Sequence, residues 1–208
     1  MNNHPMNTQE LKEAIGQDIQ TLKTLDVDIM PADQYYQANI RLFLYVFLKM
    51  YGVVVLGNVL PWLIHIREIL KHASLGEALL ELGYVELLGI GVCLFAFLFL
   101  YSPLNHYVLF KYQLKDKLQT GKMLLQKMHG AATIFYRIYV AIVLIPSTFL
   151  FPGVAVLLAF VGFLISGLLT NIIIEMELNR IGVSTLFTLV KAYFNQDKKS
   201  NHDVIKNN

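Results

Sequence analysis

Charged residues are scarce in this chain of 208 residues: Asp, Glu, Lys and Arg make up 15% of it, and hydrophobic residues make up 55%. About a quarter of the residues of a typical soluble domain are charged, so this composition is outside the usual range. The mean hydropathy of +0.50 points the same way. The composition therefore excludes an ordinary soluble domain and favours a membrane protein.

Cysteine and the common catalytic motifs are also lacking. The single cysteine, Cys93, excludes an intramolecular disulfide, and we interpret it as a small core residue. There is no G-x-S-x-G, no H-E-x-x-H and no Gly-rich phosphate loop. Because nucleophilic, metal-dependent and nucleotide-driven enzymes depend on such motifs, we expect no catalysis and no cofactor.

What the chain does have is four long apolar stretches. Each contains about the 20 residues that a helix needs to cross a hydrocarbon core of ~30 Å. They cover residues 42–64, 85–104, 131–151 and 154–174. The sequence therefore predicts an all-α membrane protein with four transmembrane helices. Its expected parts are an N-terminal amphipathic helix and linker (1–40), the transmembrane domain (41–177), and an amphipathic helix with a disordered tail (178–208).

Lysine and arginine are distributed unevenly between these stretches. The N-terminal arm, the central segment between the second and third stretches, and the C-terminal segment hold thirteen of the 17. The segment between the first two stretches has only Arg67 and Lys71, and the turn between the last two has no charge. Because cytoplasmic segments carry an excess of Lys and Arg, we predict that both termini and the central segment are cytoplasmic, in a bacterial inner membrane.

The N-terminal arm has apolar residues at three- and four-residue spacing, which predicts an amphipathic helix. They are Leu11, Ile15, Ile19, Leu22, Leu25 and Ile29. Asn7 and Glu10 have capping-box spacing, Pro31 marks the expected end, and Asp18 interrupts a coiled-coil heptad. This helix is expected to pack on the protein's own cytoplasmic side or on lipid, or to bind a partner.

The central segment is the most basic part of the chain. Leu114, Leu118, Leu125 and Met128 share one helical face, and Lys111, Lys115, Lys122 and Gln126 share another. This pattern predicts a cytoplasmic interfacial helix whose lysines face anionic lipid. Nucleic acid is not an expected partner, because no base-reading fold or aromatic interleaving is present. A further amphipathic stretch is predicted around Val183 to Phe194.

Three charged residues fall within the apolar stretches: Lys49, Glu86 and Arg137. Such residues are costly in a bilayer and are the first candidates for a functional site. We interpret Lys49 and Arg137 as snorkelling to the cytoplasmic interface or pairing with Glu175 or Glu177, and Glu86 as hydrated from the outer side. A transport or ligand role is the alternative.

The fourth stretch carries small residues at spacings of three and four: Ala155, Ala159, Gly162, Ser166 and Thr170. Such a stripe lets helix backbones approach closely. It is expected either to pack on the third stretch through a tight turn between Pro146 and Gly153, or to contact a partner or a second copy.

His65, Glu68 and His72 share a helical face after the first stretch, and a zinc site there is a further alternative. The function we expect is that of a small multi-pass protein acting by protein–protein contacts, as an accessory, immunity or exclusion-type factor. Its partner is another integral membrane protein or itself. The alternatives are an oligomeric channel or small-solute carrier, and a membrane-embedded metal-dependent enzyme.

Overall fold

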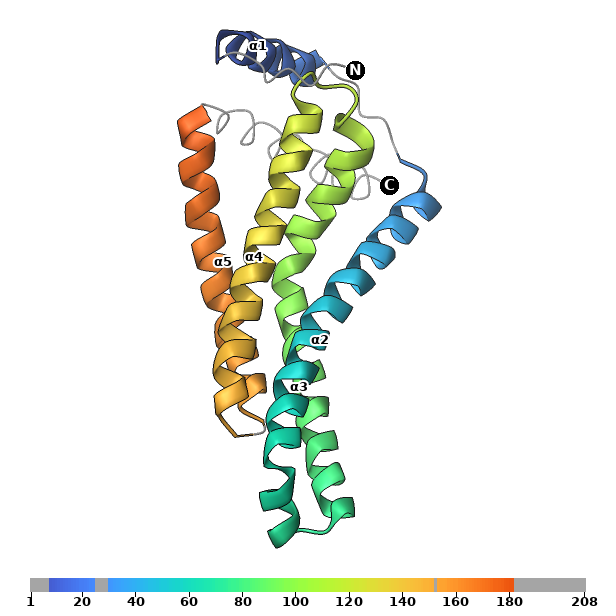
Figure 1. Ribbon diagram of the computed structural model, residues 1–208. Helices are drawn as coiled ribbons and strands as arrows, with labels where there is room; N and C mark the ends of the chain where they lie inside the picture. Colours follow the sequence, from blue (N-terminus) through green and yellow to red (C-terminus); the bar gives the residue numbers. More distant parts are fainter. Residues whose placement is uncertain (1–7, 25–29, 152, 182–208) are drawn as a thin grey trace, which may run out of the picture. The chain divides into compact units, whose positions relative to one another are not determined.

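The computed structural model describes residues 8–24, 30–151 and 153–181, which form helices and turns and no strand (Figure 1). The predicted all-α fold is therefore confirmed for the described part of the chain. The elements are α1 (Thr8–Thr24), α2 (Ala32–His72), α3 (Leu75–Leu109), the π-helix η1 (Phe110–Leu114), α4 (Gly121–Phe149) and α5 (Val154–Ile181).

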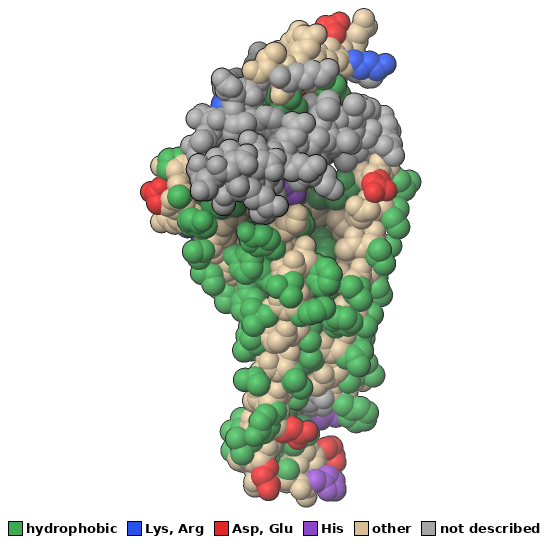
Figure 2. All heavy atoms as spheres, turned by 180° about the vertical axis from the view of Figure 1, so that it is seen from behind, with side chains coloured by type: hydrophobic (Ala, Val, Ile, Leu, Met, Phe, Trp, Pro, Cys, Tyr) green, Lys and Arg blue, Asp and Glu red, His purple; other side chains and the backbone are tan. Residues whose placement is uncertain are grey.

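Four of these helices, α2 to α5, are long and apolar enough to cross a membrane. Helices α2, α3 and α5 each contain one predicted stretch and extend beyond it, whereas α4 ends at Phe149, two residues before the third predicted stretch does. Their outer faces carry large apolar side chains such as Leu87, Leu98 and Leu168, which are 68%, 74% and 67% exposed. Figure 2 shows such side chains along the helices. Four helices of this length and composition indicate an integral, multi-pass membrane protein.

The chain divides into two compact units, which are described separately. Unit 1 comprises residues 1–36, 105–129 and 172–208, and unit 2 comprises residues 37–104 and 130–171. Unit 2 contains most of each apolar stretch. Unit 1 contains α1, η1 and the turn between α3 and α4.

The core of unit 2 is built from one face of each of α2, α3, α4 and α5. Its buried members are Met50, Val53, Val54, Cys93, Ala96, Tyr139, Val143, Ala155, Ala159 and Phe163. Three helices come close together at Gly57 on α2, where an added Cβ would lie 2.8 Å from the Ala155 Cβ and 3.0 Å from the Ser147 Oγ. Gly57 therefore lets α2 contact both α4 and α5.

The turn between α4 and α5 is shorter than the sequence pattern indicates. Pro146 lies inside α4, which continues to Phe149, so the expected turn from Pro146 to Gly153 is wrong at its beginning. Gly153 has a φ of 93°, a left-handed conformation that favours glycine. This residue sets the point at which the chain reverses into α5.

The segment between the first two spans is a helical hairpin and not a loop. We call residues 65–83 the outer hairpin: α2 continues to His72, and α3 begins at Leu75. Ser74 and Glu77 form a capping box at the start of α3, in which the Ser74 backbone N–H donates to the Glu77 Oε2 at 2.8 Å. In Figure 1 the outer hairpin runs past the α4–α5 turn.

In unit 1, α1 packs against the chain itself. Its Ile15 and Leu22 share a buried cluster with Phe110, Leu114, Leu118 and Leu124. Figure 1 shows α1 lying across the turn between α3 and α4. The apolar face of α1 is thus covered by the chain, which is one of the expected alternatives. The expected continuation to Ile29 and the capping residue Asn7 lie outside the described residues.

The central segment does not form the single interfacial helix that we expected. The end of α3 widens into the π-helix η1, a turn follows over residues 115–120, and α4 begins at Gly121. A Cβ on Gly121 would lie 2.2 Å from the Lys115 carbonyl oxygen, so only glycine fits where the turn closes. Leu114 and Leu118 were correctly grouped as apolar, but they are buried against α1.

Asp18 connects α1 to the start of α4. Its side chain is 1% exposed, and its Oδ1 and Oδ2 accept hydrogen bonds from the backbone N–H groups of Gln119 at 2.8 Å and Thr120 at 2.9 Å. The Thr120 hydroxyl also donates to Oδ2. These two N–H groups immediately precede α4, so Asp18, from a distant part of the chain, caps the entry to this helix and lies at its N-terminal end.

We predict that Gly57→Ala lowers the stability of the helix bundle by about 1–3 kcal/mol, because overpacking forces a close contact apart. Gly52→Ala is the matched control, since no heavy atom lies within 4 Å of an added Cβ there. The check is reversible unfolding in bicelles, followed by circular dichroism. Equal stabilities for the two variants would contradict the close contact at Gly57.

We predict that Asp18→Ala costs about 1–3 kcal/mol, because it leaves buried N–H groups without acceptors. Asp18→Asn keeps an acceptor oxygen and should cost less. Hydrogen exchange at the amides of Gln119 and Thr120 should become faster in Asp18→Ala and stay unchanged in the control Glu13→Ala, whose side chain is exposed. Unchanged exchange in Asp18→Ala would show that the cap does not stabilise this end of α4.

Candidate functional site

A buried polar pair joins α2 to α3 within unit 2. Asn58 is 0% exposed, and its Nδ2 donates to the Glu86 Oε1 at 3.2 Å. Asn58 lies on the face of α2 that also buries Gly57 and Pro61. An apolar helix pair in a bilayer gains stability from such a hydrogen bond, since lipid offers no alternative partner.

The pair is only half satisfied. The Asn58 Oδ1 and the Glu86 Oε2 are both buried and have no hydrogen-bond partner among the described residues. An unpaired buried polar atom costs free energy, and an ionised carboxylate in the same position costs several kcal/mol more. Such orphaned atoms in a membrane helix indicate a functional site.

The surroundings of the pair are compact. One turn after Glu86, a Cβ added at Gly89 would lie 3.0 Å from Val54 Cγ1 and 3.8 Å from Tyr51 Cε2. The Tyr51 side chain also interacts with the Glu86 carboxyl. Glu86 is half-buried with its Oε2 covered by the chain, and its hydration from the outer side stays a prediction.

The other two charged residues of the spans lie on the surface. The Lys49 ammonium sits 4.5 Å from the ring centre of Tyr45 and 5.2 Å from that of Tyr136, which are cation–π distances. Arg137 on α4 is exposed. The structure brings neither of them to Glu86, so the three charges do not form one site. A pairing with Glu177 lies outside the described side chains.

The small-residue stripe of α5 faces the inside of the bundle. Its five members are Ala155, Ala159, Gly162, Ser166 and Thr170, and all are buried by the chain. At Gly162 an added Cβ would lie 3.2 Å from Ile142 Cγ2 and 3.3 Å from Val143 Cγ2, both on α4. The stripe therefore serves packing within the chain, which is the first of the two alternatives that the sequence left open.

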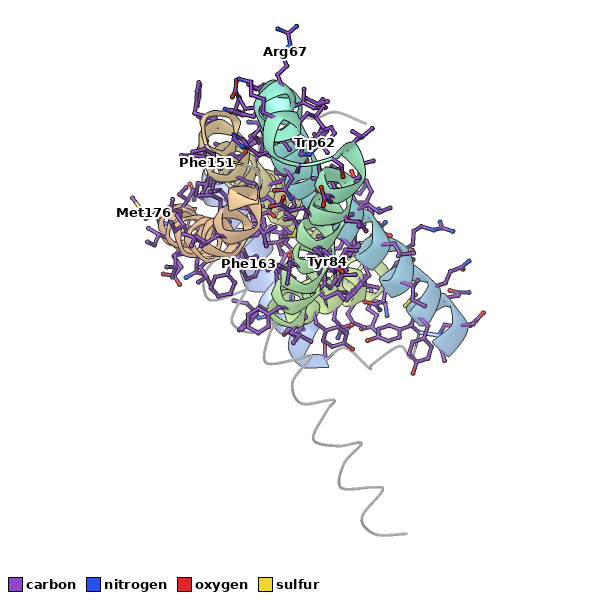
Figure 3. The ribbon with its side chains drawn as sticks, turned by 90° about the horizontal axis from the view of Figure 1, so that it is seen from below. Trp62, Arg67, Tyr84, Phe151, Phe163 and Met176 are labelled. Carbon is purple, nitrogen blue, oxygen red and sulfur yellow. The ribbon has the colours of Figure 1, made fainter. Side chains whose placement is uncertain are left out.

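The proposed histidine face does not assemble a metal site. The His65 Nδ1 lies 2.9 Å from the Pro61 carbonyl oxygen, and Glu68 pairs with Lys71 at 2.7 Å. Within the described part of the chain, no group of three His, Cys, Asp or Glu side chains is placed to hold a metal ion. Arg67, next to this face, extends away from the helices (Figure 3).

The lysines of the central segment are distributed over two elements and the turn between them. Lys111 on η1 and Lys122 on α4 are exposed, and Lys115 is half-buried. Their contact with anionic lipid stays a prediction. The amphipathic stretch expected around Val183 to Phe194 lies outside the described residues.

Sequence reasoning singled out Glu86 but missed its partner. Nothing in the local spacing connects Asn58 to a residue 28 positions later. The available signal was that both polar residues stand near the outer ends of successive apolar stretches. In an antiparallel helix pair, such residues lie at similar depth.

Comparison of the chain with protein-family models, with curated proteins and with solved structures gave no match.

Proposed function

We propose that this chain is a non-catalytic membrane protein of the bacterial cytoplasmic membrane, with both termini in the cytoplasm. It acts by binding another integral membrane protein, as an accessory, immunity or exclusion-type factor does. The uneven distribution of lysine and arginine supports this orientation. Only Arg67 and Lys71 lie in the outer hairpin, and Lys71 is paired with Glu68.

The observation that carries this proposal is the outer hairpin. It presents leucines on two rigid helix ends: Leu70, Leu75, Leu79 and Leu80 are 44%, 54%, 51% and 66% exposed. Acidic and histidine side chains are grouped at the same end of the molecule (Figure 2). Exposed leucines among polar groups, beyond the predicted spans, are typical of a protein-binding surface.

The other surfaces expected to bind a partner are occupied. The small-residue stripe of α5 is buried within unit 2, and the apolar face of α1 is buried within unit 1. The outer hairpin is therefore the surface that supports contact with another protein best.

A second candidate, an oligomeric channel or small-solute carrier, is favoured by the Asn58–Glu86 pair. Buried polar groups in a membrane bundle are often part of a path for ions or solutes. A self-assembled oligomer of this chain would be needed, because one copy of four helices is small for such a path.

We predict that a photo-cross-linking side chain at Leu80 captures a membrane protein at a stoichiometric level in the native membrane. The matched control is the same side chain at Leu98, which is 74% exposed in the middle of α3 and faces lipid. Replacing Leu75 and Leu79 by Ser should remove the Leu80 adduct, because it removes apolar contact area while the helices stay intact.

The identity of the adduct decides between the two functions. A different membrane protein, lost in the Leu75→Ser/Leu79→Ser variant, supports the accessory role. An adduct between two copies of the chain favours the channel or carrier and makes flux the next measurement. Equal labelling at Leu80 and Leu98 would mean that the outer hairpin binds no protein.

A further inference from the structure

A lysine within the first span is held by two aromatic rings. The Lys49 ammonium lies 4.5 Å from the ring centre of Tyr45, one turn earlier on α2, and 5.2 Å from that of Tyr136 on α4. Both distances are those of cation–π contacts, which restrict an otherwise flexible side chain. Because Tyr45 precedes Lys49 on α2, the side chain extends toward the end of the span at which the apolar stretch begins. Lys49 is thus positioned near one surface of the membrane.

The protein does not compensate this positive charge. In the described part of the chain, no carboxylate forms an ion pair with Lys49 or with Arg41, which lies two turns earlier on α2. Arg41, Tyr45 and Lys49 are four residues apart, so they follow one side of the helix, and all three are exposed. Leu44 and Leu48 beside them are 54% and 63% exposed. A stripe of two uncompensated cations therefore lies among apolar side chains that are free to contact lipid.

We propose that this stripe binds the phosphate group of an anionic phospholipid. Lys49 and Arg41 contact the phosphate oxygens, Tyr45 and Tyr136 position the lysine, and the acyl chains lie along the exposed leucines. A lipid fits better than a free phosphate ion, because only a lipid also uses the apolar surroundings. The assignment to the cytoplasmic leaflet rests on the orientation proposed above. The site itself does not depend on that orientation or on the contacts of the outer hairpin.

The test is native mass spectrometry of the full chain, released from mild detergent after addition of phosphatidylglycerol or phosphatidylcholine. We expect the wild type to retain one phosphatidylglycerol more tightly than phosphatidylcholine. Lys49→Gln should weaken this retention about fivefold, as expected for the loss of one lysine near a lipid headgroup. The matched control is Arg137→Gln. Arg137 is an exposed cation next to Tyr136 in the sequence, but it points about 100° away around α4, so its loss should leave retention unchanged.

Two further variants test the ring of Tyr136. Tyr136→Phe keeps an aromatic face over Lys49 and should retain the lipid, whereas Tyr136→Leu removes the face and should weaken retention. Equal retention of the two lipids, or equal losses in Lys49→Gln and Arg137→Gln, would overturn the site. Displacement of the lipid by inorganic phosphate would show that the stripe binds a free anion, and would overturn the assignment to lipid. Unchanged retention in Tyr136→Leu would overturn the positioning role of the ring.

Discussion

Hydrocarbon offers no hydrogen bonds, and this constraint governs how the chain is built. Every polar group that enters the bilayer must find a partner within the protein, which restricts the spans to helices. The same constraint explains how the side chains are placed. The hydroxyls of Ser147 and Thr148 donate hydrogen bonds to the Leu144 carbonyl oxygen of α4, and the Ser166 hydroxyl donates to the Gly162 carbonyl oxygen of α5. Against this background, the exceptions among the described residues are the buried atoms without a partner: Asn58 Oδ1, Trp62 Nε1, Glu86 Oε2 and Thr170 Oγ1.

Close packing of the helices is the second consequence of a lipid environment. Because lipid tails are as apolar as leucine, helices associate through contact and not through exclusion of water. On α5 the chain accordingly turns a stripe of small residues inward and several leucines outward. Gly57 on α2 meets Ala155 on α5, while Leu157 and Leu168 on α5 are 65% and 67% exposed. The small side chains therefore allow α2 and α5 to approach closely.

Hydropathy predicts the four spans well because it integrates over about 20 residues, and single substitutions hardly change it. Helix ends depend on single residues, which explains the errors there. The capping box of Ser74 and Glu77 is visible in the sequence and would have indicated the second helix of the outer hairpin. Pairings between distant residues were not predictable. Asp18 looked like a defect in a heptad, and its acceptor role depends on Thr120, which is 102 positions away.

That separation has a consequence for synthesis. A ribosome adds about 5–20 residues per second, so Asp18 emerges roughly 5 to 20 seconds before Thr120 does. During that interval two hydrophobic spans enter the membrane, while α1 has neither its cap contact nor its apolar partners Leu114 and Leu118. The N-terminal segment therefore stays undocked, on the cytoplasmic side predicted for it, until the α3–α4 turn has been synthesised. Docking of α1 is thus a late step in the folding of unit 1.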